Sequence, residues 1–153
     1  MILLTTALLL AATAAPPFTL RVTGRDFHWE ILYPGPDGVL DTPDDVMRQR
    51  HLHLPAHRAI AIDLRSDDYV YSLHLPDLEV TELAVPGKPY LLQFETENPG
   101  NYRLMGSQMC GYTHPELLGN LVVHETNADG IPSDCGDRVS CGLLGGHRSD
   151  AGK

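Results

Sequence analysis

The sequence has few basic residues for its acidic content. Lysine and arginine total 11, against 20 aspartate and glutamate residues, so the formal net charge is −9. This sign argues against binding to nucleic acid or to an anionic membrane surface. A basic protein partner would fit the charge, and solubility alone explains it equally well.

Long apolar runs are also scarce, because nothing after residue 15 is apolar enough to cross a bilayer, which takes about 20 residues. The first 15 residues carry no charged side chain and are followed by Pro16 and Pro17. Their length and the sequence Ala12-Thr13-Ala14 are typical of a signal peptide and its cleavage site. We expect residues 1–15 to be a signal peptide or a short membrane anchor, 16–125 one domain, and 126–153 a polar, glycine-rich tail. The protein is then exported, to the periplasm or the outer face of the cytoplasmic membrane.

Motifs of catalysis are missing as well. We find no Ser/His/Asp arrangement, phosphate loop or pair of catalytic carboxylates with a supporting motif, so the sequence predicts no catalytic site of its own. The segment DGVLDTPDD (37–45) has carboxylates without the ligand order of a calcium loop. We interpret it as an acidic turn. His51 and His53 share a strand face, and we interpret them as a solvated surface rather than a metal site.

Alternation of apolar and polar residues dominates from Leu20 to Glu125. In HRAIAIDLR, Ile60, Ile62 and Leu64 share one face of the predicted strand. Further strands are expected over 19–23, 25–33, 48–54, 69–75, 89–97, 101–105 and 119–125, separated by proline and glycine turns. Several short strands at this spacing indicate an all-β sandwich or barrel.

Cysteine is rare, with only Cys110, Cys135 and Cys141. An odd count in an exported chain leaves one thiol free or bound to a ligand. Cys135 and Cys141 lie close together in the tail, so a local disulfide between them is expected. Cys110 then remains, in the segment MCGYTHPELLGNLVV (109–123), with His114 beside it in the same loop. Thiolate and imidazole together suit copper.

Three segments give these features a family context. They are VTGRDFHWEILYPGPDGVLDTPDD (22–45), YSLHLPDLEVTELAVPGK (71–88) and NPGNYRLMGSQMCGYTHPELLGNLVV (98–123). Over residues 19–125 the chain resembles the extramembrane copper domain of cytochrome c oxidase subunit II, which carries the binuclear CuA centre. The resemblance implies a cupredoxin-like Greek-key β-sandwich. Phe27 and Trp29 fall where this family has tryptophans.

The family's copper-ligand pattern, Cys-x3-Cys-x3-His-x2-Met, is only partly kept. Cys110 and His114 match its second cysteine and its histidine. The other positions differ: Gly106 stands for the first cysteine, Leu117 for the methionine, Tyr71 for the first histidine, and Gln108 for a glutamate that binds through its backbone carbonyl. Two coppers that share one electron need two bridging thiolates. The resemblance therefore implies one mononuclear copper rather than a binuclear centre.

The third ligand stays open at this stage. Tyr71 could offer a phenolate, which favours Cu(II) and requires a lowered pKa. Met105 and Met109 carry soft thioethers that favour Cu(I) or simply fill the core, and Gln108 could offer its carbonyl. His74 is near Tyr71 in the sequence, but three residues along a strand it points to the opposite face. Our candidate ligand set is Cys110, His114, Tyr71, Gln108 and Met109.

The expected function is one-electron transfer through this copper, in or beside a respiratory chain, with a c-type cytochrome or an oxidase core subunit as partner. Two alternatives stay open: a copper-free structural or docking paralogue of oxidase subunit II, and a copper-handling protein. In the oxidase case the enzymatic activity belongs to the whole complex.

Overall fold

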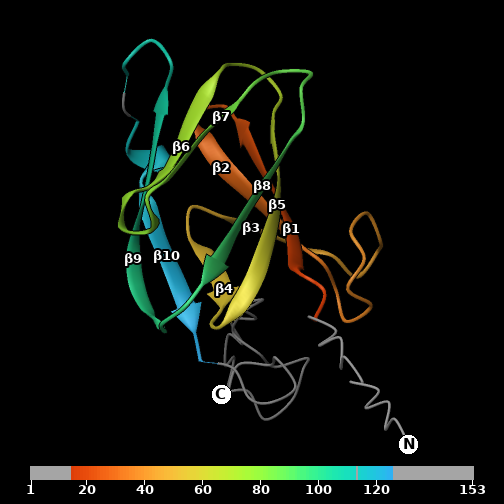
Figure 1. The fold of residues 1–153 in the computed structure, drawn as a ribbon. Helices are drawn as coiled ribbons and strands as arrows, with labels where there is room; N and C mark the ends of the chain where they lie inside the picture. Colours follow the sequence, from red (N-terminus) through yellow and green to blue (C-terminus); the bar gives the residue numbers. More distant parts are fainter. Residues whose placement is uncertain (1–14, 113, 126–153) are drawn as a thin grey trace, which may run out of the picture.

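A computed structural model describes residues 15–112 and 114–125, which fold as one β-sandwich (Figure 1). The elements follow in chain order: β1 (Phe18–Arg25), β2 (His28–Tyr33), β3 (Val46–Gln49), β4 (Leu52–Pro55), β5 (Arg58–Ser66), β6 (Tyr71–Leu75), η1 (Pro76–Leu78), β7 (Val80–Ala84), β8 (Tyr90–Thr96), β9 (Gly100–Gln108), η2 (Pro115–Leu117) and β10 (Gly119–His124). In this part of the chain no helix is long and apolar enough to cross a membrane.

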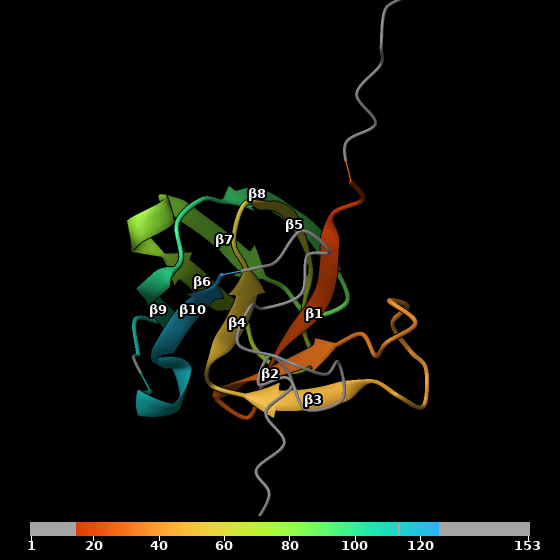
Figure 2. The same ribbon diagram turned by 90° about the horizontal axis from the view of Figure 1, so that it is seen from below.

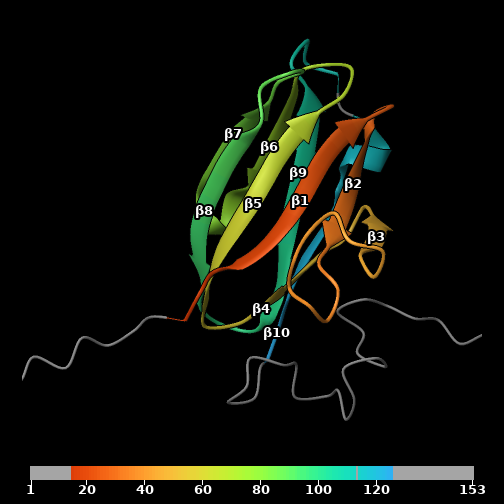
Figure 3. The same ribbon diagram turned by 90° about the vertical axis from the view of Figure 1, so that its right-hand side faces the viewer.

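Two five-stranded sheets make up the sandwich. One has the strand order β3-β2-β1-β5-β8 and the other β4-β10-β9-β6-β7. Most neighbours are antiparallel, whereas β1 pairs with β5 and β10 pairs with β4 in parallel. Figure 3 shows the first sheet in front of the second, and Figure 2 shows β4 between β10 and the β2–β3 pair. The prediction of an all-β sandwich is confirmed.

The core lies between the sheets and is built by the alternation seen in the sequence. Ile60, Ile62 and Leu64 on β5 are all buried, as predicted for one strand face. The largest fully buried side chains come from both sheets: Trp29, Tyr33, Tyr71, Leu20, Ile31, Leu52, Leu54, Ile60, Ile62, Leu64, Leu73 and Leu75. This continuous apolar layer supplies the main favourable free energy of folding.

The expected single strand over 48–54 is wrong. The chain breaks at Arg50, whose φ of 72° cannot continue a strand. Residues on either side join different sheets, β3 pairing with β2 and β4 with β10. This break carries the chain from one sheet to the other.

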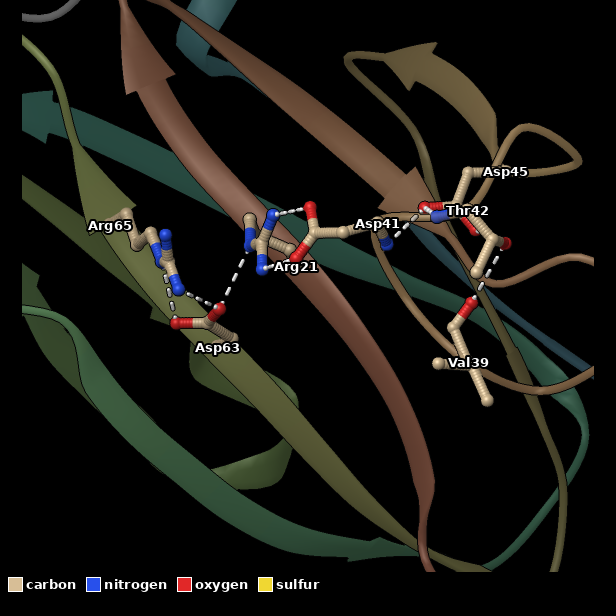
Figure 4. Close-up of polar contacts among 7 residues, drawn as sticks. All are labelled: Arg21, Val39, Asp41, Thr42, Asp45, Asp63 and Arg65. Atoms are coloured by element: carbon tan, nitrogen blue, oxygen red, sulfur yellow. Dashed lines mark hydrogen bonds and ion pairs between the residues drawn. The ribbon is translucent and has the colours of Figure 1, made fainter.

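An ion-pair row holds the acidic turn against the outer face of the first sheet (Figure 4). Arg21 Nε donates to Asp63 Oδ2 at 2.8 Å, and Arg21 Nη1 donates to Asp41 Oδ1 at 2.6 Å. Asp41 and Thr42 donate their backbone N–H groups to Asp45. The acidic turn predicted over 37–45 lies in the β2–β3 connection, and the Arg21–Asp41 ion pair holds it against β1.

Two predictions fall outside the described residues. These are the signal peptide or anchor over residues 1–15, of which only residue 15 is described, and the Cys135–Cys141 disulfide in the 126–153 tail.

Candidate metal centre

Cys110 lies in the loop that joins β9 to η2, at the upper end of the sandwich in Figure 1. Its thiol is free and exposed. Backbone bonds shape the loop: Gly111 N–H donates to the Gln108 carbonyl at 2.9 Å, and Gln108 N–H donates to the Tyr112 carbonyl at 3.0 Å. Gly111 has a φ of 85°, a conformation that glycine adopts without strain. The loop therefore presents the Cys110 thiol to solvent.

The loop is fastened to the segment between β5 and β6. Met109 N–H donates to the Val70 carbonyl at 2.9 Å. Tyr69, the preceding residue of that segment, is 46% exposed, Met109 is 66% exposed and Tyr112 is 70% exposed. The loop and the segment it bonds to thus expose three large apolar or aromatic side chains.

His114 is held by ring stacking. Its imidazole lies on the Phe27 ring with a centroid distance of 4.1 Å and an interplanar angle of 24°, and Tyr69 stacks on Phe27 at 5.1 Å. Phe27 reaches this position because Asp26 and Phe27 form the tight β1–β2 hairpin with φ values of 47° and 61°. Ring nitrogens coordinate in the plane of the imidazole, so stacking fixes His114 without blocking a metal.

Tyr71 is fully buried and hydrogen-bonded. Its hydroxyl donates to Asp68 Oδ1 at 2.8 Å and accepts the Phe27 N–H at 3.1 Å. Burial raises the pKa of Tyr71 to about 12, and the Asp68 carboxylate adds to the rise while the Phe27 bond opposes it. A phenolate ligand requires the opposite shift. Tyr71 therefore serves the site most directly by positioning the Phe27 hairpin beneath His114.

Gly106 lies where the backbone leaves no room for a side chain. A Cβ atom there would lie 2.6 Å from Trp29 Nε1 and 2.9 Å from the Leu117 carbonyl oxygen. The Trp29 indole donates to that same carbonyl at 3.2 Å, and Leu117 is fully buried beneath the loop. A second bridging thiolate does not fit at this position. The residues present therefore do not fit a binuclear copper centre.

The remaining candidates lie on different sides of the sheet. Tyr71 faces Gln108 across the β6–β9 pair, and Gln108 is half-buried. His74 and Met105 are also cross-strand partners, but His74 alternates with the buried Tyr71, Leu73 and Leu75 and so points outward. The expectation that His74 faces away from Tyr71 is confirmed.

Residues 15–112 and 114–125 contain no group of three or more His, Cys, Asp or Glu side chains that could hold a metal. A single copper bound through Cys110 and His114 would take its further donors from the Met109 thioether, a backbone carbonyl such as that of Gln108, or solvent.

Sequence reasoning missed two features of this end of the sandwich. One is the stack of Tyr69, Phe27 and His114, and the other is Asp68, which accepts from Tyr71 and from the Asp26 N–H. Alternation locates strands but does not show which loops meet at their ends. The sequence carried no clear signal for the hairpin, because Asp26 and Phe27 lie within the segment 25–33 that alternation predicted as one strand.

Comparison with known proteins finds similarity to one family over most of the described domain. The family model described as cytochrome C oxidase subunit II, periplasmic domain, matches residues 32–125. Cytochrome c oxidase subunit 2 of Thermostichus vulcanus is 24% identical over 110 residues, which cover 72% of this chain and 31% of the relative. The alternative cytochrome c oxidase subunit 2 of Bradyrhizobium diazoefficiens is 21% identical over 126 residues, covering 68% of this chain and 46% of the relative. The chain thus spans less than half the length of these relatives.

Solved structures show the same fold. The periplasmic domain of subunit II of cytochrome oxidase from Bradyrhizobium japonicum has a TM-score of 0.59 at 20% identity, covering 71% of this chain and 84% of that one. A subunit II domain captured in a mixed disulfide with a thioredoxin-like protein has a TM-score of 0.57 at 20% identity, covering 71% and 82%. The cupredoxin-like architecture expected from the sequence is confirmed.

Proposed function

The chain belongs to the family of cytochrome c oxidase subunit II periplasmic domains, and from this premise we propose that it is an exported domain that binds one mononuclear copper through Cys110 and His114. Its role would be one-electron transfer within or beside a respiratory chain. The enzymatic activity would belong to a larger oxidase complex.

One observation carries the proposal. A free, exposed thiol and an imidazole held by stacking occupy one loop. Trp29 and Leu117 leave no room for another thiolate at Gly106. The loop keeps one soft ligand pair and excludes the bridge that a second copper needs. One thiolate and one imidazole are the donor types that copper takes in electron-transfer sites.

Bound copper would supply a one-electron redox couple, and the protein would supply its donors and its surroundings. Cys110 offers the thiolate and His114 the imidazole. Met109 offers a soft thioether on the residue next to Cys110, and Gln108 a carbonyl at the base of the loop. Tyr71 remains in the candidate set by its position opposite Gln108, although its hydrogen bond to Asp68 favours the neutral phenol.

A basic partner fits the surface around the loop. Tyr69, Met109 and Tyr112 are exposed on the Cys110 loop and on the segment to which it is bonded, and the whole chain carries a net charge of −9. Exposed apolar side chains on a chain of net negative charge favour a partner of opposite charge and steer its approach. A c-type cytochrome or an oxidase core subunit is therefore the partner class that we propose.

Copper stoichiometry, measured together with the visible and electron paramagnetic resonance spectra, tests the function. We expect at most one tightly held copper, a sulfur-to-copper charge-transfer band and a mononuclear hyperfine pattern. Cys110→Ser should abolish the band, and His114→Ala should weaken binding and shift it. His74→Ala is the matched control, because it removes an imidazole from the outer face of β6 and should leave the spectrum unchanged.

Tyr71→Phe then assigns the third ligand. A spectrum unchanged by this substitution leaves Met109 or the Gln108 carbonyl. Loss of a phenolate-to-copper charge-transfer band assigns the phenolate, whereas a shift without that loss reports movement of the Phe27 hairpin that Tyr71 positions beneath His114. Protein that retains neither Cu(I) nor Cu(II) after mild chelation refutes the copper proposal.

A copper-free docking module is the second candidate, and the packing of the site end favours it. Leu117 is fully buried, Trp29 closes the space at Gly106, and Tyr71 is satisfied by Asp68 and Phe27. These side chains are thus held by protein contacts that do not require a metal. Specific binding to an oxidase core subunit by metal-free protein, undiminished in Cys110→Ser, would support this candidate.

A further inference from the structure

Two histidines from separate strands form a contact at the end of the sandwich opposite the Cys110 loop. His53 Nδ1 lies 2.9 Å from His124 Nε2, and the rings stack with a centroid distance of 5.2 Å. His53 is on β4, and His124 is the last residue of β10. The expected solvated surface at His53 is therefore wrong, because the ring is half-buried against a partner.

The chemistry of this contact depends on the number of protons it holds. One imidazole must donate an N–H and the other must accept with a lone pair. A single added proton keeps the bond, since the charged ring can donate to the neutral one. A second proton places two N–H donors face to face and breaks the bond.

Among the described residues, no anionic group near His53 balances a second positive charge. Burial is the largest cause that lowers the pKa of His53, followed by the positive charges of His124, His51 and Arg48. On the side of β2, the Tyr33 hydroxyl accepts the His53 backbone N–H at 2.7 Å. The groups facing His53 from β2, β3, β10 and its own strand are thus neutral or cationic.

The pair lies at the end of the β4–β10 ladder, which the buried side chains of Leu52 and Leu54 also anchor in the core. β4 is the edge strand of its sheet and pairs with β10 alone among the described strands. Ala56 N–H donates to the His124 carbonyl at 2.8 Å, and the Tyr33 bond ties β4 to the other sheet. Figure 1 shows β4 and the end of β10 together at the base of the molecule. Loosening β10 from β4 at His124 would therefore expose this end locally, while Leu52 and Leu54 keep the rest of β4 in the core.

We propose that the His53–His124 pair is a proton-sensitive latch that closes the β4–β10 end of the sandwich at neutral pH and releases it in acid. The latch is independent of the copper proposal, because it lies at the other end of the domain. A proton suits these two nitrogens better than a metal ion does, because a metal ion would add more positive charge near Arg48.

The sign of the pH effect follows from His53. Its pKa in the folded protein lies below the ordinary 6.5, so the unfolded chain takes up this proton first as the pH falls. The stabilisation is complete above pH 6.5 and is lost progressively below it. Linkage of one proton changes the unfolding equilibrium constant by at most about tenfold per pH unit.

Equilibrium unfolding of the full chain between pH 8 and pH 5, with EDTA present, tests the latch. We expect the unfolding constant of the wild type to rise more steeply below pH 6.5 than that of His53→Gln, by up to about tenfold per pH unit. His74→Gln is the matched control, a half-buried histidine on the same sheet, and should keep the steep dependence. Equal slopes for wild type and His53→Gln would overturn the proposal.

Hydrogen exchange on the wild type removes any dependence on how the variant folds. After correction for intrinsic rates, amides of 52–56 and 121–124 should lose protection in acid before those of β1 and β5. The His53 ring, followed by nuclear magnetic resonance, should titrate below 6.5. Unchanged protection of these segments at pH 5, or titration of His53 at or above 6.5, would contradict the latch.

Discussion

Replacing Gly106 by cysteine restores the family's first bridging ligand in the sequence, and we predict that it destabilises the domain without restoring a binuclear centre. The new Cβ atom would lie 2.6 Å from Trp29 Nε1 and 2.9 Å from the Leu117 carbonyl oxygen. Carbon atoms do not approach backbone oxygen this closely, so either the indole or the η2 backbone must move. Movement of either breaks the bond from Trp29 to Leu117.

The magnitude can be assembled from these contacts. Overpacking a filled core costs about 1–3 kcal/mol, and leaving the buried indole N–H without its acceptor costs about 1–3 kcal/mol more. Removing a glycine from the unfolded chain returns about 0.4–1 kcal/mol. The net loss is about 3 kcal/mol, a large part of the stability of about 5–15 kcal/mol that small domains have.

Urea denaturation followed by tryptophan fluorescence measures this loss directly, because Trp29 is the only tryptophan in the sequence. Ser107→Cys is the matched control: it adds a thiol one residue later on β9 at a half-buried position. We expect the control to unfold near the wild-type midpoint and Gly106→Cys well below it. A Gly106→Cys variant with wild-type stability, or one that shows a mixed-valence spectrum of two coppers, would refute this reasoning.

Three further predictions follow from the same structure. Tyr71→Phe removes the donor to Asp68 and should lower the unfolding free energy by about 1–3 kcal/mol, measured by urea denaturation; a loss below 0.5 kcal/mol, roughly the error of that comparison, would contradict it. Burial opposes the ionised form of Asp63, but hydrogen bonds from Arg65 and Arg21 outweigh burial and lower its pKa below 3.8, so this stabilisation is present above pH 3.8 and lost as the pH falls below it. Arg21→Gln should flatten the acid limb of a stability–pH curve between pH 4 and 2, and an unchanged limb would count against the ion pair. Association with a basic cytochrome c, measured by stopped flow, should slow steeply as salt rises, and a salt-independent rate would exclude electrostatic steering.

Local patterns in the sequence determined most of the strands. Alternation over HRAIAIDLR predicted the buried face of β5, and Pro-Gly turns separated its neighbours, because the strand period and turn chemistry are local properties. The same patterns failed for Val80–Ala84, which was not predicted, and for 48–54, which divides between two sheets. The alternation of apolar and polar residues shows that a segment is extended, but it does not show which strands that segment pairs with.

The missing first bridging cysteine was also visible in the sequence, since Gly106 stands at its position. The presence of Cys110 and His114 in one loop was visible for the same reason, because they are only four positions apart. Ligand counting needs residue identities and spacing, which a sequence contains in full.

Contacts between distant segments were decided only by the tertiary structure. Trp29 closes the space at Gly106 by bonding to Leu117, 88 positions away in the chain, and His53 meets His124 across 71 positions. Phe27 stacks on His114 because a hairpin of one sheet and a loop of the other lie at the same end of the sandwich. Such contacts depend on how the two sheets pack face to face. The identity of either residue alone does not indicate which distant residue it will contact.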